Sequence, residues 1–198
     1  MDKEKFEKIK GKLKKSIIGI AGLGGLGSNA AVSLARAGVG KLVLVDFDIV
    51  EKNNLNRQYY FLDQVGKYKV DALKENIKKI NPETTVETYN MKLIKGSMEK
   101  PFKEVDVVIE ALDNAETKTV FIEEILTKLP RKPIVAASGV AGYGHSDRIK
   151  TKKLGCLYMC YDEHAKSSDD DVLMAPRVIL MANWEANVAL EIILGEDK

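Results

Sequence analysis

Hydrophobic residues along the chain fall into short continuous runs, separated by longer segments in which they recur every three or four positions. The first pattern is typical of strands buried on both faces, and the second of helices that cover them. Strands are predicted at 16–21, just before Asp46, and at 84–89, 105–112 and 133–138; helices are predicted after Gly27, at 69–80 and from Asn114 to about Leu129. This alternation predicts an α/β fold with a doubly wound, mainly parallel, Rossmann-like sheet.

The two ends of the chain have other patterns. Residues 1–15 carry seven lysines around a narrow apolar stripe, which predicts a basic helix that packs on the body or on a second subunit. Residues 148–151 and 156–161 predict two antiparallel strands, and the acidic, serine-bearing stretch 162–175 predicts a mobile loop. A last helix is predicted from Pro176 to Leu194. We therefore expect a single domain over 1–198.

Composition places the chain among ordinary soluble proteins. It has 198 residues, of which 45% are hydrophobic and 30% charged, and a net charge of only +2, so nothing favours nucleic acid as a partner. With no apolar run of about 18 residues and no secretory signal, we expect a cytoplasmic protein with no membrane role. The two cysteines, Cys156 and Cys160, do not have a zinc-binding spacing, so no zinc is expected.

A glycine-rich turn follows the first predicted strand. Gly22, Gly24, Gly25 and Gly27 allow a backbone turn tight enough to approach a phosphate, and the helix that follows directs its free N–H groups at that anion. Asp46 comes 19 residues after Gly27, where a carboxylate can accept hydrogen bonds from ribose hydroxyls. The pattern predicts a nucleotide site, although it serves NAD as well as ATP and also occurs in purely structural turns.

Polar residues gather after the second and fourth predicted strands. Five of them lie in one loop: Asn53, Asn54, Asn56, Arg57 and Gln58. Asp113 and Asn114 follow the fourth strand directly, where a helix cap and a ligand-binding residue would both lie. Because ligands bind at the carboxyl edge of such sheets, these side chains are expected to meet there.

Several stretches together resemble the ThiF/MoeB family, the bacterial relatives of the ubiquitin-activating enzymes. They are GLGGLGSN at 22–29, GVGKLVLVDFDIVEKNNLNRQ at 38–58, GKYKV at 66–70 and ALDNAETK at 111–118. The stretches ASGVAGYG at 137–144 and LMAPRV at 173–178 resemble the short ThiF-like branch in particular. The resemblance covers nearly the whole chain.

The resemblance implies ATP-dependent adenylylation of the C-terminal glycine of a small ubiquitin-like sulfur carrier. Arg57 and Lys69 would bind the triphosphate, Asp113 would hold Mg²⁺, and Asp46 would bind the ribose. The remaining candidates for nucleotide binding are Gly22, Gly24, Gly25, Gly27, Asp48, Asn54 and Gln58. The polar candidates also have structural alternatives: Asp113 as a helix cap, Asp48 as the start of a turn, Arg57 and Lys69 as surface cations, and Asn54 and Gln58 as supports of their loop.

The chain also departs from the family. Residues 1–15 contain no arginine, which in longer members completes the ATP site of a neighbouring subunit. Paired CxxC zinc motifs are absent, and residues 162–175 contain no cysteine for sulfur transfer. A homodimer and a ThiS-like carrier for thiamine synthesis are the expectations from resemblance. An NAD-dependent oxidoreductase and a non-catalytic nucleotide- or carrier-binding relative are the alternatives.

Overall fold

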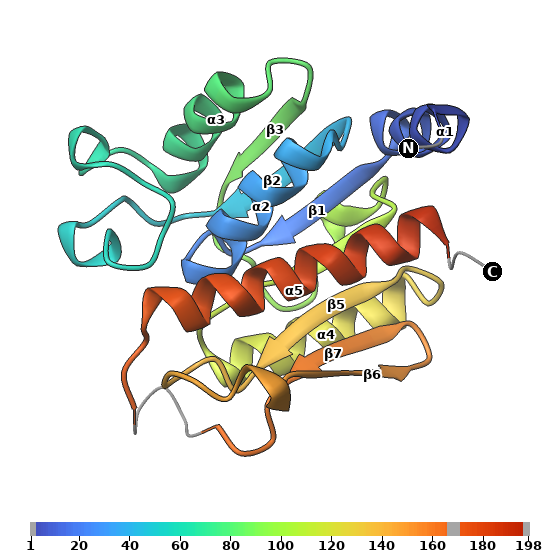
Figure 1. Cartoon of the computed structure of the whole chain (residues 1–198). Helices are drawn as coiled ribbons and strands as arrows, with labels where there is room; N and C mark the ends of the chain where they lie inside the picture. The colour runs from blue at the N-terminus through green and yellow to red at the C-terminus, as the bar shows by residue number, and fades with distance from the viewer. Residues whose placement is uncertain (1–2, 166–170, 196–198) are drawn as a thin grey trace.

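The computed structural model describes residues 3–165 and 171–195, and its centre is a twisted sheet in the order β3-β2-β1-β4-β5-β7-β6 (Figure 1). The strands are β1 Ile17–Ala21, β2 Lys41–Asp46, β3 Thr85–Asn90, β4 Val107–Glu110, β5 Ile134–Ser138, β6 Lys150–Leu154 and β7 Leu157–Tyr161. Neighbouring strands are parallel except for β6, which pairs antiparallel with β7. The predicted fold class and the antiparallel pair near the C-terminus are confirmed.

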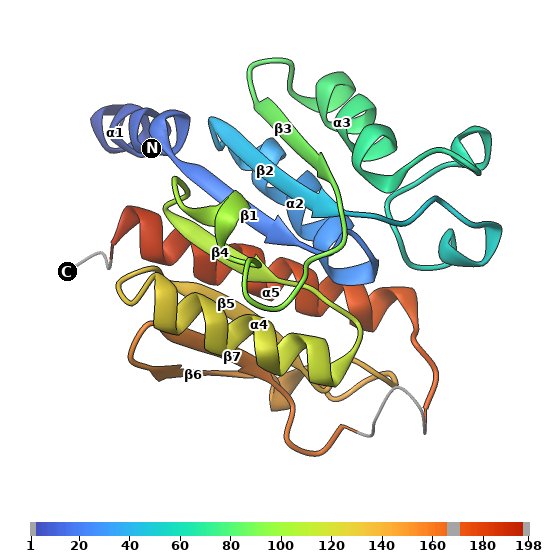
Figure 2. The same ribbon diagram turned by 180° about the vertical axis from the view of Figure 1, so that it is seen from behind.

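Helices cover both faces of the sheet. The helices α2 (Gly25–Ala37), α3 (Lys69–Ile80) and α5 (Ala175–Leu194) contribute to the core on one face, while α4 (Ala115–Lys128) covers the other (Figures 1 and 2). The basic helix α1 (Lys3–Lys15) buries Leu13, and its Lys12 ammonium donates to the carbonyl of Leu194 at 2.7 Å. Its apolar stripe therefore packs, at its C-terminal end, on the body of the same chain.

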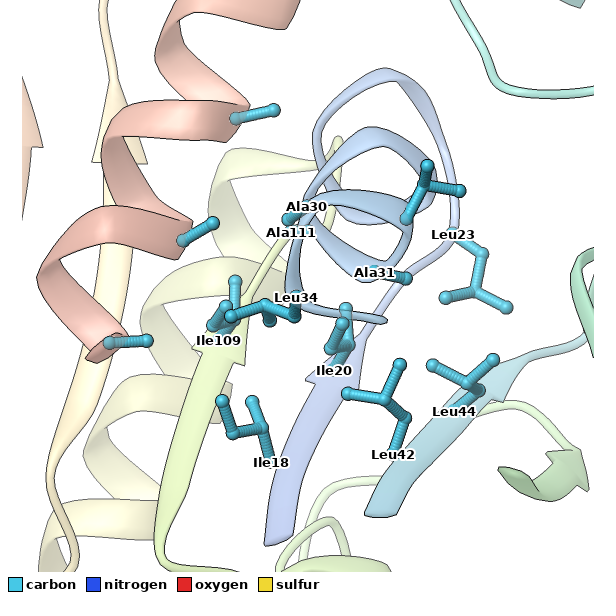
Figure 3. Close-up of a cluster of buried hydrophobic side chains, with 14 of the residues drawn as sticks. Ile18, Ile20, Leu23, Ala30, Ala31, Leu34, Leu42, Leu44, Ile109 and Ala111 are labelled. Carbon is cyan, nitrogen blue, oxygen red and sulfur yellow. The ribbon is translucent and has the colours of Figure 1, made fainter. Parts of the chain in front are cut away.

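The larger core lies between the sheet and α2. Ile18 and Ile20 of β1 and Leu42 and Leu44 of β2 point from the sheet toward this helix (Figure 3). They lie two positions apart because successive side chains of a strand point to opposite faces. The helix meets them with small residues such as Ala30, so it lies close to the strands. This packing fixes the start of α2 above the carboxyl end of β1.

Gly27 allows α2 to begin directly above the glycine turn. A Cβ atom at this position would lie only 1.9 Å from the carbonyl oxygen of Gly22. We expect Gly27→Ala to lower the free energy of unfolding by about 1–3 kcal/mol, the usual cost of overpacking, in a urea titration. Gly11 of α1 is the matched control, since a Cβ there meets no atom within 4 Å and alanine should add about 0.5–1 kcal/mol. Equal effects at the two positions would contradict this account.

Two predictions for the C-terminal third need correction. The strand predicted at 148–151 is present but shifted, because Arg148 belongs to a 3₁₀ turn and β6 runs from Lys150 to Leu154. The strand predicted from Cys156 begins at Leu157, which leaves Cys156 in the turn and half-buried, while Cys160 is buried in β7. Gly155 lies in the turn between β6 and β7, and its positive φ of 63°, which glycine adopts readily, ends the pairing of the two strands. The mobile loop predicted at 162–175 falls partly on 166–170, outside the described residues.

The carboxyl group of Glu185 is an unusual part of the core. It is completely buried in α5, and neither oxygen has a hydrogen-bond partner among the described residues. Burial raises its pKa well above the usual value, the Lys118 ammonium opposes that rise and the Glu110 carboxylate adds to it. The side chain is therefore protonated in the folded protein over a pH range in which it is ionised in the unfolded chain.

This raised pKa predicts a pH-dependent difference between wild type and Glu185→Gln. Protonation of Glu185 stabilises the folded state fully below pH 4.3, which is about the pKa of glutamate in the unfolded chain. This stabilisation is lost as the pH rises toward the higher pKa of Glu185 in the folded protein. The free energy of unfolding of Glu185→Gln should therefore rise relative to that of wild type by up to about 1.4 kcal/mol per pH unit above pH 4.3. Urea midpoints of both proteins between pH 5 and 8 measure the difference, and parallel curves would show that Glu185 is ionised in the fold.

Candidate functional site

A cavity of about 660 Å³ lies at the carboxyl edge of the sheet. Its walls come from the segments that follow β1, β2, β3, β4 and β5. Its lining includes the segments after β1 and β4, the neighbouring strands at which the order of the sheet reverses. Open α/β sheets bind ligands at this switch point, because the loops from the two strands leave in opposite directions. Of the predicted site residues, the cavity is lined by Gly22, Gly24, Gly25, Asp46, Asp48, Arg57, Gln58, Lys69 and Asp113.

The glycine turn forms the middle of the cavity wall. Gly22 has a φ of 89°, and a Cβ atom there would lie 2.6 Å from the carbonyl oxygen of Ala111, so the turn closes tightly on the end of β4. The N-cap residue of α2 is Gly24, which has no side chain to bond the first turn of the helix. The first-turn N–H groups of the helix can therefore bind an anion in the cavity.

Asp46 joins the end of β2 to the glycine turn. One carboxylate oxygen accepts a hydrogen bond from the amide of Leu23 at 2.6 Å, and the other accepts one from the amide of Asp48 at 2.8 Å. Burial raises the pKa of Asp46, opposed by the two amides and by the positive charge of Lys69. Each carboxylate oxygen can accept a second hydrogen bond, so Asp46 can still bind a hydroxyl group of a ligand.

Lys69 is the first residue of α3 and is buried, with its ammonium 2.8 Å from a carboxylate oxygen of Asp48. The backbone amide of Lys69 also donates to the carbonyl of Asp48, at 2.9 Å. The two contacts connect residues 21 positions apart and hold α3 beside the end of β2. They place a positive charge on the cavity wall with little freedom to move.

The polar loop after β2 is anchored on α2. The side-chain amide of Asn29 donates to the carbonyls of Gly25 and Arg57, at 2.7 and 2.9 Å. The Arg57 guanidinium donates to the side chain of Asn56 at 2.8 Å and lines the cavity. The side-chain oxygen of Gln58 is buried with no partner among the described residues. Buried polar atoms are normally hydrogen-bonded, so this oxygen is an exception within the cavity wall.

Asp113 and Asn114 have different positions at the start of α4. Asn114 is the helix cap, since its side chain accepts from the amide of Thr117 at 2.9 Å. Asp113 is exposed on the cavity wall. The residues described contain no cluster of three or more His, Cys, Asp or Glu side chains that could hold a metal. A single carboxylate still fits Mg²⁺, which keeps several waters and takes its other ligands from phosphate oxygens.

Two predicted site residues lie away from the cavity wall. Gly27 contacts the glycine turn from inside α2, as described above. Asn54 accepts from the amide of Glu51 at 3.1 Å and stabilises a 3₁₀ turn of its own loop. Their positions favour the structural alternative for both residues.

Sequence reasoning missed both ends of the cavity. Phe47, Met91 and Leu93 form a largely apolar end beside β2 and β3, where the Lys92 ammonium lies 5.7 Å from the centre of the Phe47 ring. Lys118, with residues 138–141, forms the end beside β4 and β5. Most of these residues come directly after a strand, so the strand ends alone could have indicated them. Lys118 gives no such signal, because it lies inside a helix.

A sequence profile described as the ThiF family matches residues 4–198. The chain belongs to the ThiF family. The match includes the glycine turn, the polar loop after β2 and the Asp113 turn, so every wall of the cavity lies within the family domain. None of the helices described in this ThiF-family chain is long and apolar enough to cross a membrane.

Several known proteins are similar to the ThiF-family chain. "Adenylyltransferase and sulfurtransferase UBA4" of Scheffersomyces stipitis is 34% identical over 191 residues, which are 93% of this chain and 43% of that protein. "Ubiquitin-like modifier-activating enzyme 5" of Oryza sativa subsp. japonica is 39% identical over 116 residues, which are 52% of this chain and 28% of that protein. The chain thus spans less than half the length of these relatives.

The fold is shared with solved structures. The E. coli tRNA N6-threonylcarbamoyladenosine dehydratase TcdA, solved in complex with ATP, matches with a TM-score of 0.86 and 22% identity, over 95% of this chain and 89% of that one. At this level of identity the match establishes that the ThiF-family chain has the same fold, and it carries no statement about substrate.

Proposed function

We propose that the chain is an ATP-dependent adenylyltransferase that activates the C-terminal glycine carboxylate of a small ubiquitin-like carrier. The observation that carries this proposal is the convergence of Arg57, Lys69, Asp113 and Asp46 around the glycine turn in one cavity. Membership of the ThiF family and the names of the two similar proteins support the same activity.

The reaction requires positioning and charge neutralisation more than covalent catalysis. A carboxylate is a weak nucleophile toward a polyanionic triphosphate, so the site must hold both groups in line and balance their charge. Lys69 supplies a fixed positive charge, and Arg57 supplies a planar group that can bind two phosphate oxygens at once. Bound Mg²⁺ would be held by Asp113 and would neutralise phosphate charge.

The nucleoside is proposed to bind in the part of the cavity beside β2 and β3. Asp46 can accept hydrogen bonds from the ribose hydroxyls, and the apolar end formed by Phe47, Met91 and Leu93 suits an adenine ring. Gln58 lines the same wall and has a buried side-chain oxygen with no partner among the described residues. Asp48 contributes through its ion pair with Lys69.

The carrier is proposed to be ThiS-like, ending in Gly-Gly, with a role in thiamine synthesis. This assignment rests on the resemblance of 137–144 and 173–178 to the short ThiF-like branch. A homodimer in the cytoplasm is part of the same proposal.

Exchange of labelled pyrophosphate into ATP tests the activity. Wild type should catalyse exchange with a recombinant ThiS protein and not with the same protein lacking its terminal glycine. Absence of exchange with any carrier ending in Gly-Gly would refute the proposal. Binding of NAD without binding of ATP would instead favour an oxidoreductase, since the glycine turn and Asp46 serve either nucleotide.

Two variants separate an enzyme from a non-catalytic relative. Asp113→Ala and Arg57→Ala should abolish exchange while carrier binding, measured by calorimetry, persists. A non-catalytic binding module would show no pyrophosphate exchange even in the wild type, and neither substitution would change that result.

A further inference from the structure

The cavity contains an ion pair that the nucleotide roles described above do not use. Lys118 of α4 lines the cavity with a side chain that is 21% exposed. Its ammonium donates to the carboxylate of Glu110, the last residue of β4, whose side chain is completely buried. The other oxygen of Glu110 accepts from the amide of Leu112 at 2.8 Å. Glu110 therefore fixes both the lysine and the turn that carries Asp113.

The ammonium of Lys118 has unused hydrogen-bonding capacity. It carries three donors, and Glu110 is its only partner among the described residues. Burial raises the pKa of the Glu110 carboxyl, while the charge of Lys118, its hydrogen bond and the Leu112 amide oppose that rise. A buried pair of this kind costs desolvation energy, so it is weak as a stabilising device. Its position on a cavity wall suggests binding instead.

Strand order separates Lys118 from the nucleoside half of the cavity. In the order β3-β2-β1-β4-β5, the ends of β3 and β2 carry Met91 and Asp46, and the end of β1 carries the glycine turn. Lys118 lies beyond that turn, beside β4 and β5. The wall at the end of β5 consists of Ala137, Ser138, Gly139, Val140 and Ala141, and most of these side chains are small. This end of the cavity therefore combines a positive charge with mostly small side chains.

We propose that Lys118, positioned by Glu110, binds the carboxylate of the acyl substrate rather than the phosphates of ATP. This inference rests on the proposed function and assigns its second substrate to the β4–β5 end of the cavity. One carboxylate oxygen forms a bond to the α-phosphorus, the bond from that phosphorus to the bridging oxygen breaks, and pyrophosphate leaves with the electron pair. No proton is transferred. Lys118 reduces the repulsion between the carboxylate and the triphosphate during this approach.

Lysine replacements at two places in the cavity test the assignment. Lys118→Met should leave the Kd for MgATP within about twofold of wild type and raise the KM for recombinant ThiS by about 10-fold or more, the usual loss of a charge-assisted hydrogen bond. Lys118→Arg keeps the charge and should recover most of that loss. Lys69→Met should show the opposite pattern, with weaker MgATP binding. Lys79→Met, on the exposed side of α3, controls for the loss of one charge.

The outcomes distinguish this inference from the proposed function. A wild type that exchanges pyrophosphate while Lys118→Met keeps a normal KM for ThiS overturns the inference alone. Loss of MgATP binding in Lys118→Met equal to that in Lys69→Met also overturns it. A wild type inactive with every carrier overturns both. If Lys118→Met fails to fold because Glu110 is left unpaired, the double variant Lys118→Met/Glu110→Met removes both charges and carries the same test.

Discussion

Lys69→Met is expected to weaken MgATP binding by about 100-fold while the chain remains folded. The Lys69 ammonium is held on the cavity wall by Asp48, beside Asp46, so its removal leaves two carboxylates facing the triphosphate. Loss of one or two charge-assisted hydrogen bonds costs about 1.5–3 kcal/mol each, which gives a change of this size. Methionine can replace the buried methylene chain of Lys69, and water can solvate the partly exposed carboxylate of Asp48. The variant is therefore expected to remain folded.

Isothermal calorimetry with MgATP measures this effect. Lys69→Arg keeps the charge and should lose less affinity, whereas Lys79→Met, which removes an exposed charge from the same helix, should bind like wild type. Asp48→Asn separates the two functions of the pair, because it frees the lysine without removing it. A change below about threefold in Lys69→Met would show that the triphosphate lies elsewhere.

Arg177→Met is expected to lower the free energy of unfolding by about 3–5 kcal/mol, the usual cost of leaving one buried charge without its partner. Arg177, near the start of α5, is buried, and its guanidinium lies 2.5 Å from a carboxylate oxygen of Asp162. Burial alone would raise the pKa of Asp162, but the amide of His164 and the charge of Arg177 hold it below its usual value. The same guanidinium donates to the carbonyls of Gly139 and Gly144, so it also holds the loop after β5.

Urea unfolding of single and double variants measures this coupling. Asp162→Leu combined with Arg177→Met removes both charges and should recover much of the stability lost in the single variant. Because the pKa of Asp162 is lowered in the fold, its contribution to the free energy of unfolding is complete above about pH 3.9, the pKa of aspartate in the unfolded chain. This contribution is lost as the pH falls toward the lower pKa of Asp162 in the folded protein. An Arg177→Met variant as stable as wild type at pH 7 would contradict this role.

Local patterns predicted most elements because they depend on residues close in sequence. The helix at 69–80 has the predicted bounds, since Val70, Leu73 and Ile77 repeat at the helical period and Asn81 and Pro82 end it. The third strand is shifted by one residue, to Thr85–Asn90. The largest error, at Arg148, arose where a short polar segment gave no period to distinguish a turn from a strand.

The candidate site was predictable at positions where a polar residue lies at or just after the end of a predicted strand. Asp46 is the last residue of one buried strand and Asp113 comes shortly after another, and in a parallel sheet all such ends meet at one edge. Sequence left open whether Asp113 or Asn114 caps α4, because both residue types cap helices well. The fold decides it, since the amide of Thr117 points at Asn114 and leaves Asp113 on the cavity wall.

The sequence by itself determined the fold class, the glycine turn and the family, because periodicity and a long motif are properties of neighbouring residues. Only the tertiary structure decided the joining of Arg177 to Asp162 and the position of Lys118 on the cavity wall. It also places Gly27 and Asn54 outside the lining of the cavity. These contacts depend on how helices and loops pack across the sheet, and no local pattern fixes which distant partner a charged side chain meets.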